Sequence, residues 1–121
     1  MITLSNFSVS FQNNLALKNA SVEIKSGERL GIVGESGSGK TMLGLSLMGM
    51  IPEGAAISGS IKVEDQNMTN ITDKLWQEFR ARKIAMVFQE PMAALNPLRR
   101  VGDTVIEPLV VHEGISRGKA M

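Results

Sequence analysis

Residues Gly34 to Thr41 form the segment with the clearest chemical potential, Gly-Glu-Ser-Gly-Ser-Gly-Lys-Thr, which fits the pattern G-x-x-x-x-G-K-[ST]. Backbone N–H groups of residues 36–41 can wrap a phosphate only where the chain adopts positive φ, which glycine permits. In such a loop Lys40 would reach the β- and γ-phosphates of a nucleotide, and the Thr41 hydroxyl would be a ligand of Mg²⁺. The pattern therefore predicts a phosphate-binding loop with the candidate residues Gly34, Ser36, Gly37, Ser38, Gly39, Lys40 and Thr41.

The segments on either side of this loop predict how it is positioned. Residues 29–33 (RLGIV) form a short apolar run typical of a buried strand, and residues 40–50 are mostly Leu, Met and small residues, typical of a helix buried on most sides. Such a helix would point the positive end of its dipole at the bound anion. The alternative is a flexible Ser/Gly linker with an incidental lysine, which does not suit a position between two buried elements.

The remaining patterns predict an α/β domain. Residues 84–88 (IAMVF) are a second apolar run and indicate a buried strand, while the charged stretch 73–83 indicates a short helix with Trp76 and Phe79 facing the core together. Residues 102–111 are predicted to be helical up to Pro108, which would bend or restart the helix. Strands are also predicted at 2–11, 19–24 and 60–64.

Gln89 is a second candidate for chemistry, because it directly follows the apolar run 84–88. The carboxyl ends of parallel strands form the sheet edge at which ligands bind. A neutral carboxamide at that edge can coordinate Mg²⁺ through its oxygen or orient a water molecule. The alternative is a solvated glutamine in a loop.

Composition excludes several other classes of protein. The chain has 121 residues, 43% hydrophobic and 21% charged, with thirteen Lys+Arg against twelve Asp+Glu, so it has no large basic field for nucleic acid. Zero cysteines exclude a disulfide framework, and the single His112 excludes a multi-histidine metal site. No window reaches the ~18 consecutive apolar residues of a membrane span. The start lacks the pattern of a secretory signal, so we expect a cytosolic protein, with peripheral membrane attachment left open.

The segment 86–97, Met-Val-Phe-Gln-Glu-Pro-Met-Ala-Ala-Leu-Asn-Pro, carries a family resemblance. With the phosphate-binding loop, it resembles the ATP-binding subunit of an ATP-binding cassette (ABC) importer of the dipeptide, oligopeptide and nickel branch. Val101-Gly102 and Glu107-Pro108-Leu109 fit the same branch. The resemblance covers Ile2 to about Lys119. The loop motif alone is generic, and residues 88–97 identify the branch.

The resemblance implies a fold and a set of site residues. It implies an α/β P-loop NTPase core with an N-terminal antiparallel β region, truncated before the helical subdomain, so that residues 1–121 are the N-terminal portion of a nucleotide-binding domain. Gly34 to Thr41 would be the Walker A motif, and Gln89 would be the Q-loop glutamine that touches Mg²⁺ and the attacking water. Phe11 would stack on adenine, the alternative being a core residue of an amphipathic strand. The implied cofactors are ATP and Mg²⁺.

The sequence departs from the family pattern because the signature motif, Walker B and the switch histidine do not occur in it. Ser58-Gly59-Ser60 is too short for a signature motif, the Pro91 context argues against Glu90 as a Walker B carboxylate, and His112 precedes any signature. The complete subunit would be an ATPase, whereas this chain alone is expected to be inactive. Without the neighbouring strand, residues 29–33 are expected to expose unpaired backbone groups.

The resemblance also implies partners. These are transmembrane permease subunits, a second ATP-binding subunit and, indirectly, a solute-binding protein, with the subunit on the cytoplasmic face of the membrane and importing peptides or nickel-like solutes. Residues 92–111 would lie near the permease, with Arg99 and Arg100 contributing to assembly. Two alternatives remain at this point. One is a P-loop enzyme that is not a transporter, such as a kinase, and the other is a nucleotide-binding fragment without turnover.

Overall fold

The computed structural model describes residues 1–12, 14–88 and 95–121 and divides the chain into two compact units, Met1–Trp76 and Gln77–Met121. In the first unit, one sheet contains strands β1 (Ile2–Phe11), β2 (Asn14–Ile24), β3 (Ala55–Val63) and β4 (Gln66–Asn67) in the order β2-β1-β3-β4. All three strand pairs are antiparallel. The predicted strands at 2–11, 19–24 and 60–64 therefore exist, the last two as parts of longer strands.

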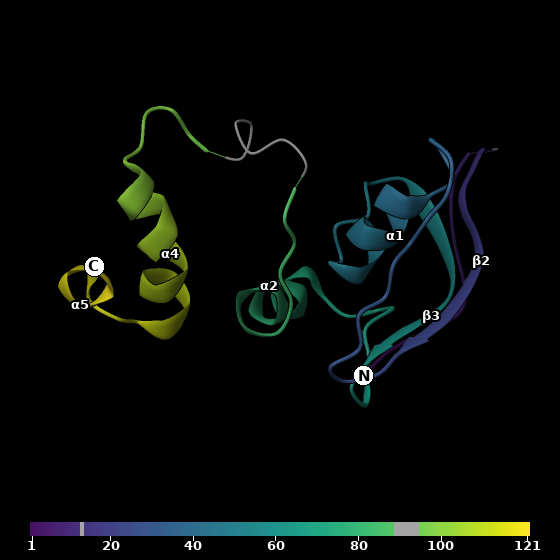
Figure 1. Cartoon of the computed structure of the whole chain (residues 1–121), viewed down its shortest axis with the longest axis horizontal. Coiled ribbons are helices and arrows are strands. Elements are labelled where there is room, and N and C mark those ends of the chain that lie inside the picture. Colours follow the sequence, from purple (N-terminus) through teal and green to yellow (C-terminus); the bar gives the residue numbers. More distant parts are fainter. Residues whose placement is uncertain (13, 89–94) are drawn as a thin grey trace. The chain divides into compact units, whose positions relative to one another are not determined.

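The register between β1 and β2 shifts at three places, and two of these shifts contain an asparagine in the left-handed conformation. Asn6 has φ 47° and Asn19 has φ 46°, at positions where the register between β1 and β2 shifts. Asparagine tolerates this conformation better than most residues. At each bulge a serine hydroxyl accepts the asparagine N–H, Ser21 for Asn6 and Ser8 for Asn19, both at 2.9 Å. Bulges increase local twist, and Figure 1 shows the sheet curving with helix α1 against its concave side.

The bulge at Asn6 also decides which side chains of β1 reach the core. Leu4, Phe7 and Val9 are all buried, although strict alternation would place Leu4 and Phe7 on opposite faces. The extra residue in β1 shifts the alternation by one position. This shift brings all three side chains into the core between β1 and α1 (Lys40–Leu47). A simple alternation of apolar and polar residues along the sequence would not indicate that arrangement.

The predicted buried strands at 29–33 and 84–88 are wrong for this structure, because neither segment is a strand. Val33 and Val87 are each 96% exposed. Residues 29–33 make no backbone hydrogen bond to any other described residue. An extended segment becomes a strand only when a neighbour pairs with its N–H and C=O groups. The expectation that residues 29–33 would expose unpaired backbone groups is therefore confirmed.

Helices α1, α2 and α4 begin within one residue of their predicted positions, whereas α5 was not predicted. Helix α2 spans Asp73–Arg82, α4 spans Val101–Glu113 and continues through Pro108, and α5 spans Arg117–Ala120. Trp76 is buried, as predicted, whereas Phe79 is only half-buried. In the part of the chain that the structure describes, none of the helices combines the length and the apolar character needed to cross a membrane.

Gly49, two residues after the end of α1, lies against a tryptophan ring. Gly49 has φ 63°, and a Cβ at this position would overlap the indole ring of Trp76. Gly54 has φ 81° but open space where its Cβ would lie. The two glycines therefore share one conformational requirement and differ in packing.

We predict that Gly49→Ala lowers the free energy of unfolding by about 2–4 kcal/mol, because backbone strain adds to the overlap with Trp76. The matched control Gly54→Ala should lose only about 1 kcal/mol from strain. Urea unfolding followed by circular dichroism measures both. Equal losses in the two variants would contradict the packing argument.

In the second unit, the side chain of Arg117 in α5 contacts the carboxylate of Asp103 in α4. The hydrogen bond from Arg117 has the largest effect and lowers the pKa of Asp103. Burial, the next largest effect, raises the pKa, and the positive charges of Arg117, Arg100 and Arg99 lower it. The side chain of Asp103 is 20% exposed.

Because the pKa of Asp103 is lowered in the folded state, this contact contributes fully above the ordinary aspartate pKa and is lost as pH falls through the lowered value. We predict that Arg117→Gln moves the pKa of Asp103 up towards its ordinary value, whereas the control Lys119→Gln leaves it almost unchanged. Carboxyl-carbon NMR titration measures the shift. An ordinary pKa for Asp103 in the unmodified chain would refute the prediction.

Candidate phosphate-binding site

The loop before α1 has the backbone conformation that the sequence predicts. Gly37 has φ 80° and Gly39 has φ 89°, both in the left-handed region. A Cβ on Gly39 would lie 2.7 Å from the carbonyl oxygen of Ala16, and one on Gly34 would lie 2.6 Å from Ser38 Oγ. Gly37 and Gly39 therefore have a conformational reason to be glycine, whereas the contact at Gly34 involves a serine hydroxyl that can rotate away.

The start of α1 offers unused hydrogen-bond donors. Gly39 is the N-cap and provides no side-chain cap, and no acidic residue occurs in the first turn. The first bond of the helix runs from Leu43 N–H to the Gly39 carbonyl at 2.8 Å. The N–H groups of residues 39–42 have no hydrogen-bond partner within the described part of the chain. The described residues supply no acceptor for these donors. The donors and the helix dipole together therefore favour binding of an anion at this position.

Lys40 folds back over the loop that precedes it. Its Nζ donates to the carbonyl oxygens of Gly34 and Glu35, each at 2.6 Å, and to Ser38 Oγ at 3.2 Å. An ammonium group has three donors, so the loop uses all of them. These three bonds hold the positive charge of Lys40 against the loop that precedes the helix.

The sheet fixes the position of this loop through β2. Gly39 lies against the backbone of Ala16, and the neighbouring Leu17 is buried. Leu43 and Ser46 are the buried residues of α1. Sequence reasoning missed the role of Ala16, because the contact involves its backbone carbonyl and leaves no signal in residue type.

The three other candidate residues differ in how far the structure places them. Phe11 is half-buried at the end of β1 and pairs with Asn14 of β2, two residues before Ala16. Thr41 is exposed in the first turn of α1. Gln89 lies outside the described residues, so its predicted place at a sheet edge is untested.

The residues present fit a magnesium nucleotide better than a metal ion alone. Within the described ranges 1–12, 14–88 and 95–121, no group of three or more His, Cys, Asp or Glu side chains could hold a metal. Mg²⁺ is commonly bound by few protein oxygens, with phosphate oxygens and water completing its shell. The Thr41 hydroxyl is an oxygen donor beside the phosphate-binding loop, so it would supply one such ligand.

Comparison with known proteins gives matches over almost the whole chain. The sequence model of the ABC transporter family matches residues 17–119. The oligopeptide transport ATP-binding protein OppD of Salmonella typhimurium is 39% identical over 105 residues, which are 87% of this chain and 31% of that protein. The dipeptide transport ATP-binding protein DppD of Lactococcus lactis is 39% identical over 108 residues, 88% of this chain and 31% of that protein.

Solved structures give the same result for the fold. The dimeric structure of the bacterial ABC transporter cassette MJ0796 superimposes with a TM-score of 0.80 at 30% identity, covering 99% of this chain and 52% of that one. A post-hydrolysis structure of MJ0796 bound to ADP and Pi gives 0.78 at 29% identity, covering 99% and 54%. The chain thus spans about half of the solved cassette and about a third of the curated relatives it matches.

Proposed function

We propose a nucleotide-binding role, because this chain belongs to the ABC transporter family. Residues 34–41 would be the Walker A motif of an importer's ATP-binding subunit, and they would bind the phosphates of ATP together with Mg²⁺. The expected fold is confirmed, since an ABC cassette superimposes on 99% of the chain and the N-terminal sheet is antiparallel. The expected likeness to oligopeptide and dipeptide transport ATP-binding proteins is confirmed as well. ATP binding by this chain is the proposal.

The observation that carries the proposal is the arrangement of donors around the loop. The N–H groups of residues 39–42 are free within the described part of the chain, and the Lys40 ammonium lies inside the same loop. A bound phosphate would accept from these N–H groups, and Lys40 would exchange its contact with Ser38 Oγ, the longest of its three, for a phosphate oxygen. Positive φ at Gly37 and Gly39 keeps the backbone open to the anion.

The roles of the other site residues follow from the same proposal. Phe11 would provide an aromatic face for adenine at the end of β1. Thr41 would be a ligand of Mg²⁺, and Gln89 would be a second one and would orient the attacking water. When bound, Mg²⁺ would neutralise charge on the phosphates. Lys40 and Gln89 would thereby take part in catalysis.

The wider proposal concerns the complete subunit. Residues 1–121 would be the N-terminal portion of its nucleotide-binding domain, from Walker A to just past the Q-loop. ATP binding would close two such subunits and hydrolysis would reopen them, driving import of peptides or nickel-like solutes from the cytoplasmic face of the membrane. The chain alone would bind nucleotide without turnover. OppD and DppD are named for oligopeptide and dipeptide transport, which favours peptides as the solute.

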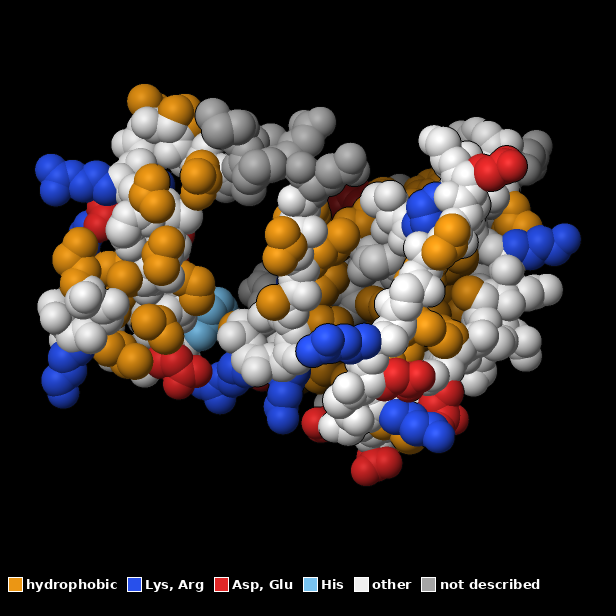
Figure 2. Space-filling model, viewed as in Figure 1, with side chains coloured by type: hydrophobic (Ala, Val, Ile, Leu, Met, Phe, Trp, Pro, Cys, Tyr) orange, Lys and Arg blue, Asp and Glu red, His pale blue; other side chains and the backbone are white. Residues whose placement is uncertain are grey.

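Helix α4 supports a permease contact in the region 92–111. Three of its apolar side chains are at least 41% exposed at a spacing of four residues, namely Val101, Val105 and Leu109. Figure 2 shows hydrophobic side chains gathered over this helix. Arg99 Nη1 contacts Glu107 Oε2 at 2.8 Å, so its charge is already compensated. Arg100 is therefore the better candidate for a charge that meets a partner.

We predict that Lys40→Ala weakens binding of Mg-ATP to the 121-residue chain by about 10- to 100-fold, because a hydrogen-bonded charge is removed from the phosphates. The matched control Lys18→Ala changes an exposed lysine of β2 and should bind normally. Isothermal titration calorimetry measures both. Equal affinity of Lys40→Ala and the unmodified chain would refute the assignment of the loop, and transfer of phosphate to a soluble acceptor would favour a kinase.

We predict that Arg100→Glu in the complete subunit weakens assembly with the permease by about tenfold or more, since a like charge at an interface is costly. Lys119→Glu in α5 makes the same change of charge outside α4 and should assemble normally. Co-purification with the permease from detergent gives the readout. Unchanged recovery of Arg100→Glu would remove this residue from the interface.

A further inference from the structure

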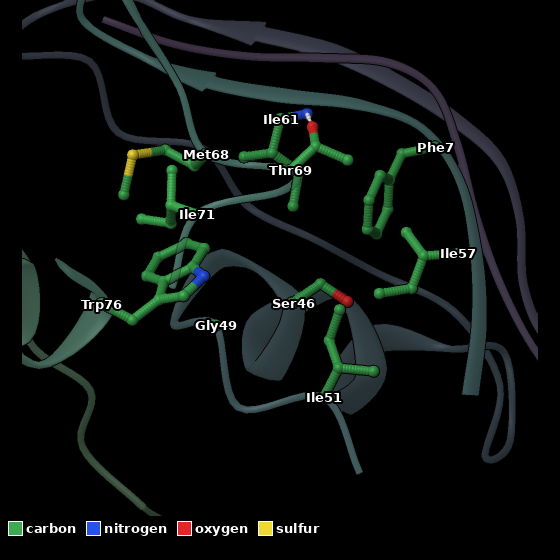
Figure 3. Close-up of a pocket in the computed structure, with 10 residues that line it drawn as sticks. All are labelled: Phe7, Ser46, Gly49, Ile51, Ile57, Ile61, Met68, Thr69, Ile71 and Trp76. Atoms are coloured by element: carbon green, nitrogen blue, oxygen red, sulfur yellow. Dashed lines mark hydrogen bonds between the residues drawn. The ribbon is translucent and has the colours of Figure 1, made fainter. Parts of the chain in front are cut away.

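Residues 29–33 form an apolar segment that the core of the first unit does not include. That core lies between the concave face of the sheet, α1 and Trp76, around a cavity of about 220 Å³ that Figure 3 shows. By contrast, Val33 is 96% exposed and Ile32 48%. Every residue from 25 to 38 is exposed, along the stretch of chain that joins β2 to α1 in Figure 1. Another chain can therefore reach this segment along its whole length.

The backbone of this segment has unused hydrogen-bonding groups. The N–H and C=O groups of residues 29–33 have no hydrogen-bond partner among the residues that the structure describes. A Cβ on Gly31 would meet no atom within 4 Å, so the space beside the middle of the segment is open. Unpaired N–H and C=O groups on an exposed segment are a template for pairing with another extended chain. The occupant that suits this segment is therefore a β-strand.

Two opposite charges show which strand fits. Arg29 stands at the start of the segment and Glu35 two residues after its end. Neither side chain has an ion-pair partner in the described part of the chain. The acid before the segment, Glu28, already accepts the N–H of Lys25 at 2.7 Å. A strand that brings an acid to Arg29 and a base to Glu35 would satisfy both charges, and a second copy of the same residues carries both.

We propose that two copies of this chain pair through residues 29–35 as antiparallel strands related by a two-fold axis at Ile32. In this register each Arg29 lies opposite Glu35 of the other copy, so that one ion pair forms at each end of the paired segment. A shift of the register by one residue in one direction places Glu28 opposite Glu35, which is repulsive. A shift in the other direction separates Arg29 from Glu35. The charges therefore select a single register.

The sizes of the side chains agree with this register. Leu30 lies opposite Gly34 of the other copy, and Val33 lies opposite Gly31, so each large side chain meets a residue that has none. Ile32 meets its own counterpart, which adds an apolar contact at the centre. Glycine weakens a strand, and the paired segment is short. The dimer is therefore weak, and we expect a dissociation constant of about 100 µM.

The pairing is separate from the proposed nucleotide site. Phosphate would use the N–H groups of residues 39–42, whereas the pairing uses backbone groups of residues 29–33. The two carbonyl groups that accept from Lys40 Nζ also lie outside residues 29–33. Dimerisation should therefore occur with or without nucleotide, and failure of one proposal leaves the other standing.

The test begins with sedimentation equilibrium of the 121-residue chain at concentrations from about 10 µM to about 1 mM, which bracket the expected dissociation constant. The mass should rise from that of a monomer towards that of a dimer. In a mixture of isotope-labelled and unlabelled chains, filtered Overhauser effects should connect the Leu30 methyl groups of one copy to the Gly34 Cα protons of the other. A monomer throughout this range, or contacts between copies only at residues 84–88 or in α4, would overturn the proposal.

A charge exchange tests the register. Arg29→Glu alone and Glu35→Arg alone should each weaken dimerisation at least about tenfold, because each places like charges opposite one another. The double variant Arg29→Glu/Glu35→Arg exchanges the two charges and should recover the affinity to within about threefold. Lys62→Glu makes the same reversal at an exposed position of β3 and should dimerise as the unmodified chain does.

Circular dichroism identifies a variant that fails to fold, and the Overhauser effects of the unmodified chain then decide. Equal dimerisation of the folded single variants and the unmodified chain would overturn the proposal. So would a folded double variant that dimerises no better than the single ones.

Discussion

The contact between Gly39 and the carbonyl of Ala16 joins the phosphate-binding loop to the sheet, and the rest of the site depends on it. A Cβ at residue 39 would lie 2.7 Å from that oxygen, so only glycine allows so close an approach. The sheet can receive α1 because the bulges at Asn6 and Asn19 curve it. The loop is thus held from one side by strand β2 and from the other by the helix that follows it.

Lys40 shows how the loop is organised without a bound anion. Its ammonium group bonds to two carbonyl oxygens and one hydroxyl of its own loop. All three of its donors are used in this way, so a phosphate would have to replace one of these bonds to reach the ammonium group. The N–H groups of residues 39–42 have no hydrogen-bond partner among the described residues, so they are open to an anion.

The two apolar runs that flank the functional motifs show the limit of local patterns. Residues 29–33 and 84–88 have the composition of buried strands, yet both are without regular structure and strongly exposed at Val33 and Val87. Composition indicates which segments are able to be interior strands. Whether they become strands depends on a neighbour that offers its own N–H and C=O groups, and residues 29–33 have none among the described residues.

The sequence alone predicted the glycine-rich loop 34–41, the helix that starts at Lys40 and three of the strands, because glycine spacing and apolar periodicity are local properties of the chain. The antiparallel arrangement and the family followed from the resemblance that residues 34–41 and 86–97 carry. The sequence could not determine the one-residue shift in side-chain alternation that buries both Leu4 and Phe7. Nor could it determine the contact of Gly39 with Ala16 or the cavity beside Trp76. These depend on backbone positions brought together from distant parts of the sequence. Residue types do not encode the approach of two backbones, so only the tertiary structure decides it.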